Sequence, residues 1–405
     1  MDTLITAGLV YPVGAPPLPH GCIAVKNGGV TAVGKAGEFS ASGFDRTIDL
    51  SGHIIMPGFV NAHSHLQLSA ARGKINRDVG FVEWVRRVID FSRAASGEER
   101  DEGMRRGIAE MLATGTTAVG DIVSDARFAA PLAASKLRGV VFVEAIAPLE
   151  KDAQKASDTM ERQLEALWEM GVTPGISPHA PHTVSRRLFR LLTKLSQKHS
   201  LIMTTHAAES GAEDEYLRNG TGEMRGLLAE RGGATEGFEG YGVSPVRFLD
   251  ECGALERLLA VHLNTVNDGD VELLRTRDAT PLFCPGSSRW FKRERVMPLD
   301  TLFNLGIRPA LGTDSLASNF SLSMLDELRA AAEYFPLIDR ARLVEAATLN
   351  GGRALGLECG SIAKGKRADV IAFAWNGKDD PLDCIFRATE PDFVMISGEG
   401  ILKAV

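Results

Sequence analysis

The fold of this chain is decided by the stretch MPGFVNAHSH at residues 56–65, in which two histidines directly follow a short apolar run. The apolar residues 58–61 are predicted to form a strand. Residues i and i+2 of a strand point to the same side, so the imidazoles of His63 and His65 can face one ion. A His-x-His pair alone is weak support for a metal site, and the rest of the chain has to supply further ligands.

Outward from this stretch, short apolar runs alternate with helix-like stretches through the middle of the chain. The predicted strands are 58–61, 116–121, 139–145, 173–177, 201–205, 258–261, 281–283 and 309–311. The predicted helices include 81–94, 98–113, 155–170, 185–198 and 322–334. Alternating strands and helices indicate a parallel sheet with crossover helices, and eight strands fit an α/β fold of the (β/α)8 TIM-barrel type. A doubly wound open sheet is the alternative.

The two ends of the chain have a different pattern, with short β-branched or apolar runs separated by turns. The predicted terminal strands are 4–10, 21–26, 29–33, 368–373 and 392–396. Neither end can bury a core alone, so we expect them to pair. The prediction is a small β-sandwich domain made of residues 1–56 and 351–405, beside a barrel domain of residues 57–350.

Polar side chains with metal or proton chemistry stand at the ends of the predicted barrel strands. These residues are His63, His65, His179, His206, His262 and Asp314, with Glu209 three residues after His206. The carboxyl ends of barrel strands meet at one mouth, where active sites lie. Three histidines and an aspartate suit a catalytic divalent ion, so we expect one ion, zinc first and iron as the alternative. The predicted metal ligands are His63, His65, His206 and Asp314.

Composition restricts the class of protein. The 405 residues carry a net charge of −7, which argues against broad binding to nucleic acid or anionic membranes. The first residues lack the pattern of a signal peptide, and no apolar run is long enough to span a bilayer. Five scattered cysteines form no CxxC pair. We expect a cytoplasmic protein with a small-molecule substrate, and a homo-oligomer is an open alternative.

Several motifs together resemble the amidohydrolase superfamily, in the branch that includes S-adenosylhomocysteine, aminodeoxyfutalosine and guanine deaminases and triazine hydrolases. The matching motifs are MPGFVNAHSH (56–65), FVEWV (81–85), GTT (115–117), SPHAP (177–181), HAAE (206–209), GTDS (312–315), NGGRALG (350–356) and GSIAKGKRAD (360–369). They extend over nearly the whole chain. The combination is specific for the superfamily and the branch but not for the substrate.

The resemblance implies a barrel with a β-sandwich formed from both termini, and a single metal, because the segment after the fourth strand has no lysine to be carboxylated. It implies hydrolytic deamination of a ring carbon that bears an amino group. In that reaction Asp314 takes a proton from water, Glu209 protonates the adjacent ring nitrogen, and His262 stabilises the attacking oxygen. The resemblance also assigns substrate binding to Glu83, Trp84 and His179, with Glu83 accepting hydrogen bonds from vicinal hydroxyls.

The substrate stays open between several classes. Glu83 and His179 favour an adenine nucleoside: S-adenosylhomocysteine, methylthioadenosine, adenosine or aminodeoxyfutalosine. The loop 284–291 departs from the relatives, and its Arg289 is expected either to shape the pocket for an aromatic carboxylate or to lie on the surface. The segment 219–242 either caps the mouth or packs outside. The other candidate functions are a chlorohydrolase or aminohydrolase of s-triazine-like rings and a metal-binding scaffold without catalysis.

Overall fold

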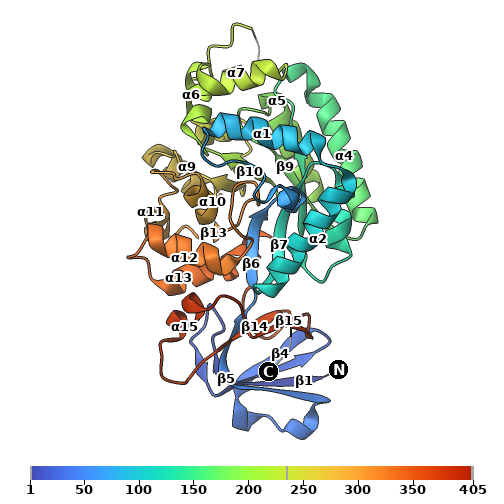
Figure 1. Ribbon diagram of the computed structural model, residues 1–405, viewed down its shortest axis with the longest axis vertical. Helices are drawn as coiled ribbons and strands as arrows, with labels where there is room; N and C mark the ends of the chain where they lie inside the picture. Colours follow the sequence, from blue (N-terminus) through green and yellow to red (C-terminus); the bar gives the residue numbers. More distant parts are fainter. Residues whose placement is uncertain (1, 234–235, 403–405) are drawn as a thin grey trace.

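The computed structural model describes residues 2–233 and 236–402 in two parts stacked end to end (Figure 1). The lower part is a β-sheet that contains strands from near both ends of the chain. The upper part alternates strands and helices. Strand β5 (Arg46–Pro57) of the lower sheet leads directly into β6 (Phe59–Ser64) of the upper part, so the stretch 56–65 joins the two.

The lower part combines strands from both ends of the chain in one mixed sheet. Its strands are β1 (Thr3–Val10), β2 (Leu18–Pro19), β3 (Gly21–Lys26), β4 (Gly29–Lys35), β5, β14 (Val370–Ala374), β15 (Phe393–Ile396) and β16 (Glu399–Leu402). The order is β16-β15-β14-β5-β1-β3-β4, with β2 beside β1. Strand β5 pairs in parallel with β1 and antiparallel with β14, and this pairing joins the N-terminal strands to the C-terminal ones.

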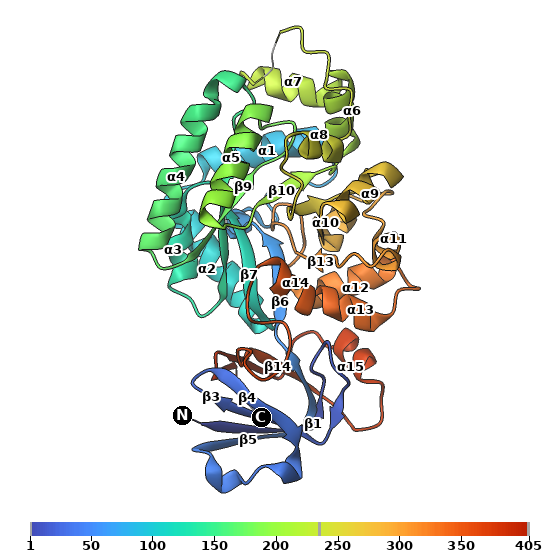
Figure 2. The same cartoon turned by 180° about the vertical axis from the view of Figure 1, so that it is seen from behind.

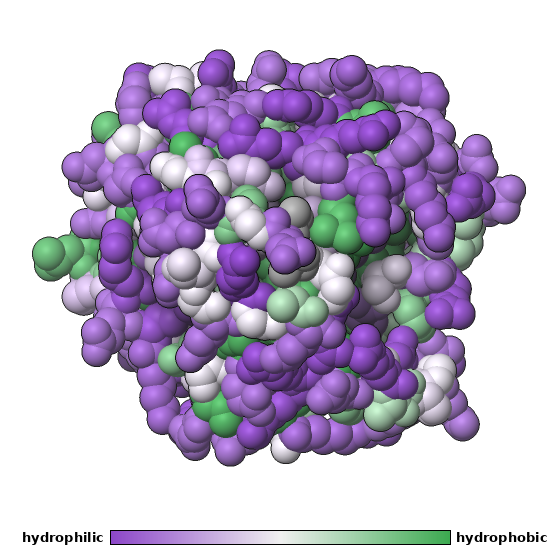
Figure 3. Space-filling model, turned by 90° about the horizontal axis from the view of Figure 1, so that it is seen from above, coloured by the Kyte–Doolittle hydropathy of each residue, from purple (hydrophilic) through white to green (hydrophobic). Residues whose placement is uncertain are grey.

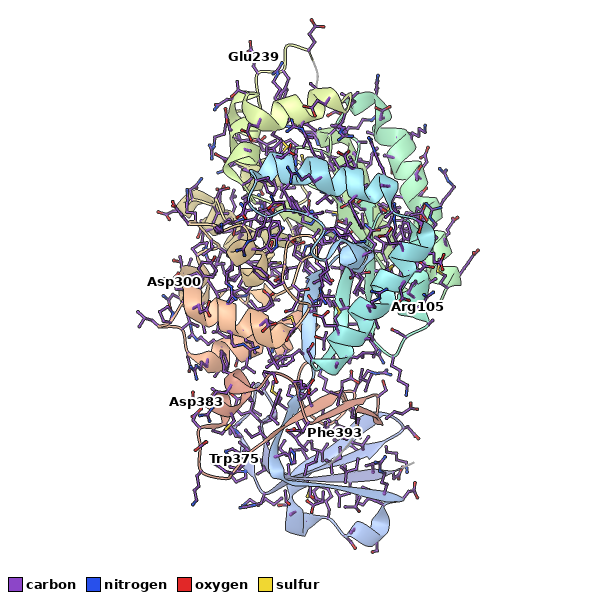
Figure 4. The ribbon with its side chains drawn as sticks, viewed as in Figure 1. Arg105, Glu239, Asp300, Trp375, Asp383 and Phe393 are labelled. Carbon is purple, nitrogen blue, oxygen red and sulfur yellow. The ribbon has the colours of Figure 1, made fainter. Side chains whose placement is uncertain are left out.

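The predicted pairing of the two ends is confirmed, because the described strands are hydrogen-bonded into a single sheet, and the packing of this sheet as a sandwich stays a prediction. Alternate residues of its strands share one apolar core that includes Ile5, Ile23, Ile55 and Phe393. Figure 4 shows Phe393 on β15 within this part, opposite Glu239 at the other end of the molecule. The boundaries 1–56, 57–350 and 351–405 stay predictions.

The upper part contains the eight predicted strands in two parallel sheets. One sheet has the order β6-β7-β8-β9, and the other has β10-β11-β12-β13. The remaining bounds are β7 (Thr116–Val123), β8 (Arg138–Ala145), β9 (Thr173–Pro178), β10 (Thr204–Ala207), β11 (Leu259–His262), β12 (Thr280–Phe283) and β13 (Ala310–Leu311). Single parallel bridges connect the sheets on both sides, Ile176 with Met203 and Ser64 with Asp314.

Strand β10 starts three residues later than predicted. Helix α5 (Arg186–His199) ends at Ser200, which has a φ of 54°, in the left-handed region. The backbone N–H of Leu201 then donates to the carbonyl of Ser196 and completes the helix end. Leu201 is therefore used by the helix cap, although its apolar side chain is typical of a strand.

Most of the helices surround the two parallel sheets, whereas the short α15 (Pro381–Arg387) lies beside strand β14 of the lower sheet (Figures 1 and 2). Besides α5 and α15, the helices are α1 (Phe81–Ala94), α2 (Gly97–Ala113), α3 (Ala130–Ala133), α4 (Ala153–Glu169), α6 (Gly211–Asn219), α7 (Gly222–Glu230), α8 (Pro245–Glu251), α9 (Asp268–Thr276), α10 (Pro285–Trp290), α11 (Leu299–Asn304), α12 (Met324–Tyr334), α13 (Arg340–Ala346) and α14 (Leu349–Ala354). Short 3₁₀ turns cover Ala36–Glu38, Ala41–Gly43, Leu66–Ala71, Ala126–Ala129 and Glu150–Asp152. Within the described residues, none of the helices has the length and apolar character needed to span a membrane.

Helices α1 and α7 lie together at the end of the molecule farthest from the lower sheet (Figures 1 and 2). Two ion pairs connect them: Arg86 with Glu230 at 2.8 Å, and Asp90 with Arg231 at 3.7 Å. The segment 219–242 thus contributes a helix that packs on α1, while its residues 234 and 235 lie outside the described residues. Viewed from this end, the surface is mostly hydrophilic, with scattered hydrophobic side chains (Figure 3).

Candidate active site

Three histidines from the two parallel sheets meet at the carboxyl ends of their strands. His63 lies in β6, His65 directly follows it, and His206 lies in β10. The Nε2 atoms of His65 and His206 are 3.2 Å apart, and the ring centroids of His63 and His206 are 5.1 Å apart. One ring nitrogen from each of the three lies within 4.8 Å of the others, so a single ion can contact all three.

Asp314 follows β13 and completes this group. Its Oδ1 lies 3.6 Å from Nε2 of His63 and 3.7 Å from Nε2 of His65. Its Oδ2 accepts hydrogen bonds from the hydroxyls of Ser287 (2.9 Å) and Ser318 (2.7 Å). The two hydroxyls fix the carboxylate, so that Oδ1 faces the histidines. Burial raises the pKa of Asp314, but contact with His63 and the other histidines outweighs burial and holds it well below its usual range.

The local backbone explains why glycine precedes this aspartate by two residues. The N–H groups of Thr313 and Asp314 both donate to the carbonyl of His63, so the chain passes very close to β6. A Cβ at Gly312 would lie 2.7 Å from the Cβ of His63. Asp314 itself has a φ of 59°, which is unfavourable for residues other than glycine. Such strain is typical of functional sites, where surrounding contacts hold it in place.

Burial affects two of these histidines strongly, and the ring nitrogens of all three face one another. Burial lowers the pKa of His65 to about 3, and it lowers that of His206 well below the usual value. Nδ1 of His206 lies 2.8 Å from the carbonyl of His179, so Nδ1 donates and Nε2 keeps its lone pair. Among the described residues, the buried Nε2 of His63 has no hydrogen-bond partner. Three imidazoles, one of them with a ring nitrogen that lacks a hydrogen-bond partner, and an ionised carboxylate form a donor set that fits zinc or iron(II).

Glu209 lies beside this group, two residues after the end of β10. Its Oε2 is 3.8 Å from Nε2 of His262, at the end of β11, and its Oε1 accepts from Arg293 at 2.9 Å. Burial raises the pKa of Glu209 to about 8 and outweighs the opposing effect of Arg293. The carboxyl group is therefore protonated at neutral pH and can donate a proton. Burial lowers the pKa of His262 to about 3, so this imidazole is neutral.

Three further residues at the site carry no signal in a recognised motif. Glu213 of α6 is buried, and its Oε2 accepts from the backbone N–H of Glu209 at 2.8 Å. Arg293 pairs with Glu209, as described above. Glu144, in β8, has its Oε1 4.0 Å from Nε2 of His179, and burial raises its pKa to about 7. Its position near the end of a predicted strand is the one feature that could have identified it.

These groups open into one cavity of about 380 Å³. Three of the predicted metal ligands, His65, His206 and Asp314, line it together with Glu209. Helix α1 lines it through an apolar face that includes Trp84. The Trp84 indole N–H donates to the carbonyl of Ala317 at 2.9 Å, which fixes the ring. His179 also lines the cavity, and its Nδ1 lies 2.7 Å from the hydroxyl of Thr183. The structure therefore brings together the predicted metal ligands, Glu209, His262, Trp84 and His179.

Two predicted substrate-binding residues do not line this cavity. Glu83 lies on another face of α1, where its carboxylate pairs with Arg87 at 3.0 Å. Arg289 pairs with Glu333 at 3.1 Å, and half of its side chain is exposed. A motif gives the position of a residue in the sequence but not the face of the helix that meets the cavity. Substrate binding by these two side chains stays a prediction.

Comparison with known proteins shows which family the chain belongs to. The model of the amidohydrolase family matches residues 54–401. A 5-methylthioadenosine/S-adenosylhomocysteine deaminase of Thermococcus kodakarensis is 32% identical over 348 residues, which cover 82% of this chain and 76% of the relative.

Two solved structures share the fold over 99% of this chain. An adenosine deaminase from Xanthomonas campestris with bound zinc has a TM-score of 0.82 at 27% identity, over 93% of its own chain. The Helicobacter pylori aminofutalosine deaminase, in complex with methylthio-coformycin, has a TM-score of 0.87 at 22% identity, over its whole chain. Because the family model matches most of its length, this chain belongs to the amidohydrolase family.

Proposed function

We propose that this chain is a hydrolytic deaminase that replaces the amino group of a purine nucleoside by oxygen from water and releases ammonia. The observation that carries the proposal is a cavity in which Glu209, whose pKa burial raises to about 8, lies beside a group of three histidines and Asp314. A proton donor next to a site for a divalent ion is what hydrolytic deamination of a ring requires. The deaminase named above, 32% identical, supports the same reaction class.

His63, His65, His206 and Asp314 are the residues that would hold one divalent ion, zinc in the first place. When bound, the ion supplies Lewis-acid chemistry that makes water a nucleophile near neutral pH. The bound zinc of the Xanthomonas campestris enzyme supports this choice of metal. The two serine hydroxyls on Oδ2 of Asp314 leave Oδ1 to accept the proton of the attacking water.

Glu209 and His262 carry the remaining proton chemistry. With its raised pKa, Glu209 donates a proton to the ring nitrogen next to the amino-bearing carbon, so that the ring can take up the electron pair during attack. The neutral His262, 3.8 Å from Glu209, stabilises the attacking oxygen by a hydrogen bond. Trp84 and His179 line the cavity and hold the rest of the substrate.

The proposal extends to the architecture and the setting of the protein. The two parallel sheets act as one (β/α)8 barrel, and the bridges on both sides support closure. The cytoplasmic location, the homo-oligomer and the lack of nucleic-acid binding stay predictions. The alternative is an s-triazine-like substrate hydrolysed with the same four metal-binding residues, and the assay below separates it from the nucleosides.

The experiment is a measurement of ammonia release by the zinc-loaded protein from adenosine, methylthioadenosine, S-adenosylhomocysteine and an s-triazine. In Glu209→Gln, turnover of the nucleosides is expected to fall by roughly 10²–10⁴-fold, while zinc content is kept. The matched control is Glu256→Gln, an exposed residue away from the cavity, with turnover near that of the unaltered protein. Release from the triazine alone, or near-normal turnover in Glu209→Gln, contradicts the proposal.

A further inference from the structure

One buried carboxyl group close to the metal-facing residues has no part in the chemistry described above. Glu327 belongs to the first turn of α12, and its side chain is fully buried. It is not among the described residues that line the cavity, so a substrate there does not touch it. Burial of a carboxyl group is costly unless hydrogen bonds replace the lost water. The hydrogen bonds of Glu327 therefore indicate what this residue does.

Both carboxyl oxygens of Glu327 accept hydrogen bonds, and the two donors come from different loops. Oε2 accepts from the backbone N–H of Gly286, at the start of α10 and shortly after β12, at 2.7 Å. Oε1 accepts from the side-chain amide of Asn319, in the loop after β13, at 2.7 Å. The same amide nitrogen donates to the carbonyl of Thr313 at 2.7 Å. One carboxyl group thus connects the loops that follow two neighbouring strands.

The two donors are sequence neighbours of the serines that hold Asp314. Gly286 directly precedes Ser287, and the hydroxyl of Ser287 donates to Oδ2 of Asp314. Asn319 directly follows Ser318, whose hydroxyl donates to the same oxygen. Each hydrogen bond of the buried carboxyl group is therefore one residue away from a hydrogen bond to the metal-facing carboxylate. A shift of either loop moves a serine and changes the direction of Oδ1.

The packing around Glu327 leaves little room for another arrangement. A Cβ at Gly286 would lie 2.6 Å from the amide nitrogen of Asn319 and even closer to Oε1 of Glu327, so a side chain is excluded there. Oδ1 of Asn319 accepts from the backbone N–H of Phe320 at 2.7 Å, which turns the amide nitrogen toward the carboxyl group.

Glutamine cannot replace this carboxyl group without loss. Burial raises the pKa of Glu327 to about 8. In both protonation states each carboxyl oxygen keeps a lone pair for its donor, because a protonated carboxyl oxygen still accepts. A glutamine side chain has one acceptor oxygen and one NH₂ group, so it would direct a donor against either Gly286 or Asn319.

We propose that Glu327 is a positioning residue: by holding Gly286 and Asn319, it places the two serine hydroxyls that direct Asp314 toward the divalent ion and the attacking water. This inference rests on the proposed function, in which Asp314 is a metal ligand and a proton acceptor. It goes beyond that function by giving a role to a residue that contacts neither ion nor substrate. It also has a direct consequence, because replacement of Glu327 should matter only while Ser287 and Ser318 are present.

The first measurement is zinc affinity in competition with a chelator. Replacement of a residue that supports a metal ligand typically costs 10–100-fold in metal affinity or activity. We therefore expect the zinc affinity of Glu327→Gln to fall about tenfold or more. The matched control is Glu333→Gln on the same helix, where the side chain is 64% exposed and pairs with Arg289. Its zinc affinity should equal that of the unaltered protein.

Two further readouts separate positioning from a general loosening of the fold. In the cobalt-substituted protein, the visible absorption bands depend on the arrangement of the ligands around the ion. We expect these bands to shift in Glu327→Gln and to stay in place in Glu333→Gln. With saturating zinc, kcat for adenosine should fall in Glu327→Gln while KM stays near its normal value, because the residues that line the cavity are unchanged.

A double-mutant cycle tests the route by which Glu327 acts. In protein that already carries Ser287→Ala and Ser318→Ala, adding Glu327→Gln should lower zinc affinity by less than about twofold, because the hydroxyls to be positioned are absent. A further tenfold loss there shows another route and overturns the inference. If Glu327→Gln yields no folded protein, Asn319→Ala removes one of its two hydrogen bonds and takes its place in the same cycle.

The outcomes separate this inference from the proposed function. Normal zinc affinity and an unchanged cobalt spectrum in Glu327→Gln overturn the inference and leave the deaminase proposal intact. If the unaltered protein binds no zinc and releases no ammonia from any of the nucleosides, the proposed function is overturned and the inference with it.

Discussion

The pH dependence of the reaction should be set by Glu209 and tuned by Arg293. Burial raises the pKa of Glu209 to about 8, so the proton-donating form is present below that pH and is lost as pH rises through it. Arg293 opposes this effect through a contact of 2.9 Å in which both side chains are only 14% exposed, so solvent screens it little. We therefore predict that Arg293→Gln moves the alkaline limb of activity to higher pH.

The size of the shift follows from the contact. A hydrogen bond to a charged group contributes about 1.5–3 kcal/mol, and one pKa unit corresponds to about 1.4 kcal/mol. The alkaline limb is expected to rise by about one to two pH units in Arg293→Gln. The measurement is kcat/KM against pH with adenosine, because this ratio reports groups of the free enzyme.

Arg289→Gln provides the matched control for this experiment. Arg289 lies four residues earlier in the chain, pairs with Glu333 and does not line the cavity. Its removal takes away the same charge without the contact to Glu209, so its profile should follow that of the unaltered protein. The reasoning is refuted if the Arg293→Gln profile stays in place or moves to lower pH, or if Arg289→Gln shifts it equally.

Three other predictions concern the metal-facing residues and the lower sheet. Ser318→Ala removes one of the two hydroxyls that fix Asp314. Its zinc affinity, measured in competition with a chelator, should therefore fall about tenfold or more. The control Ser321→Ala, near the protein surface, should bind zinc normally. Removal of the ion by a chelator should lower the thermal midpoint of unfolding, because removal leaves Nε2 of His63 buried without a partner. Added zinc should restore the midpoint. An equal midpoint with and without the ion contradicts this prediction. Phe393→Ala should cost about 3–5 kcal/mol in chemical denaturation, because its side chain is buried in the lower core; a loss below about 1 kcal/mol would contradict that packing.

The metal-facing residues could be predicted from the sequence because strand ends of a parallel sheet converge. His63, His206 and Asp314 are more than a hundred residues apart, yet each follows or ends a short apolar run. Once the runs are read as parallel strands, the rule for barrel mouths brings these side chains together. The same argument found Glu209 and His262.

The tertiary structure was needed for every residue whose role depends on orientation. Glu83 and Trp84 are neighbours in one motif, but a helix turns by about 100° per residue, so one faces the cavity and the other does not. Glu144, Glu213 and Arg293 stand in no recognised motif, and packing brings them to the site. Nor did the apolar runs at the two ends of the chain show that they form a single sheet.

The sequence by itself determined the alternating strands and the pairing of the two ends, and it predicted the ligand set for one ion, because these depend on residue type and spacing along the chain. Only the tertiary structure decided the raised pKa of Glu209 and the face of α1 that lines the cavity. Burial and charge at a site come from segments that are distant in sequence, and no spacing along the chain records which of them pack together.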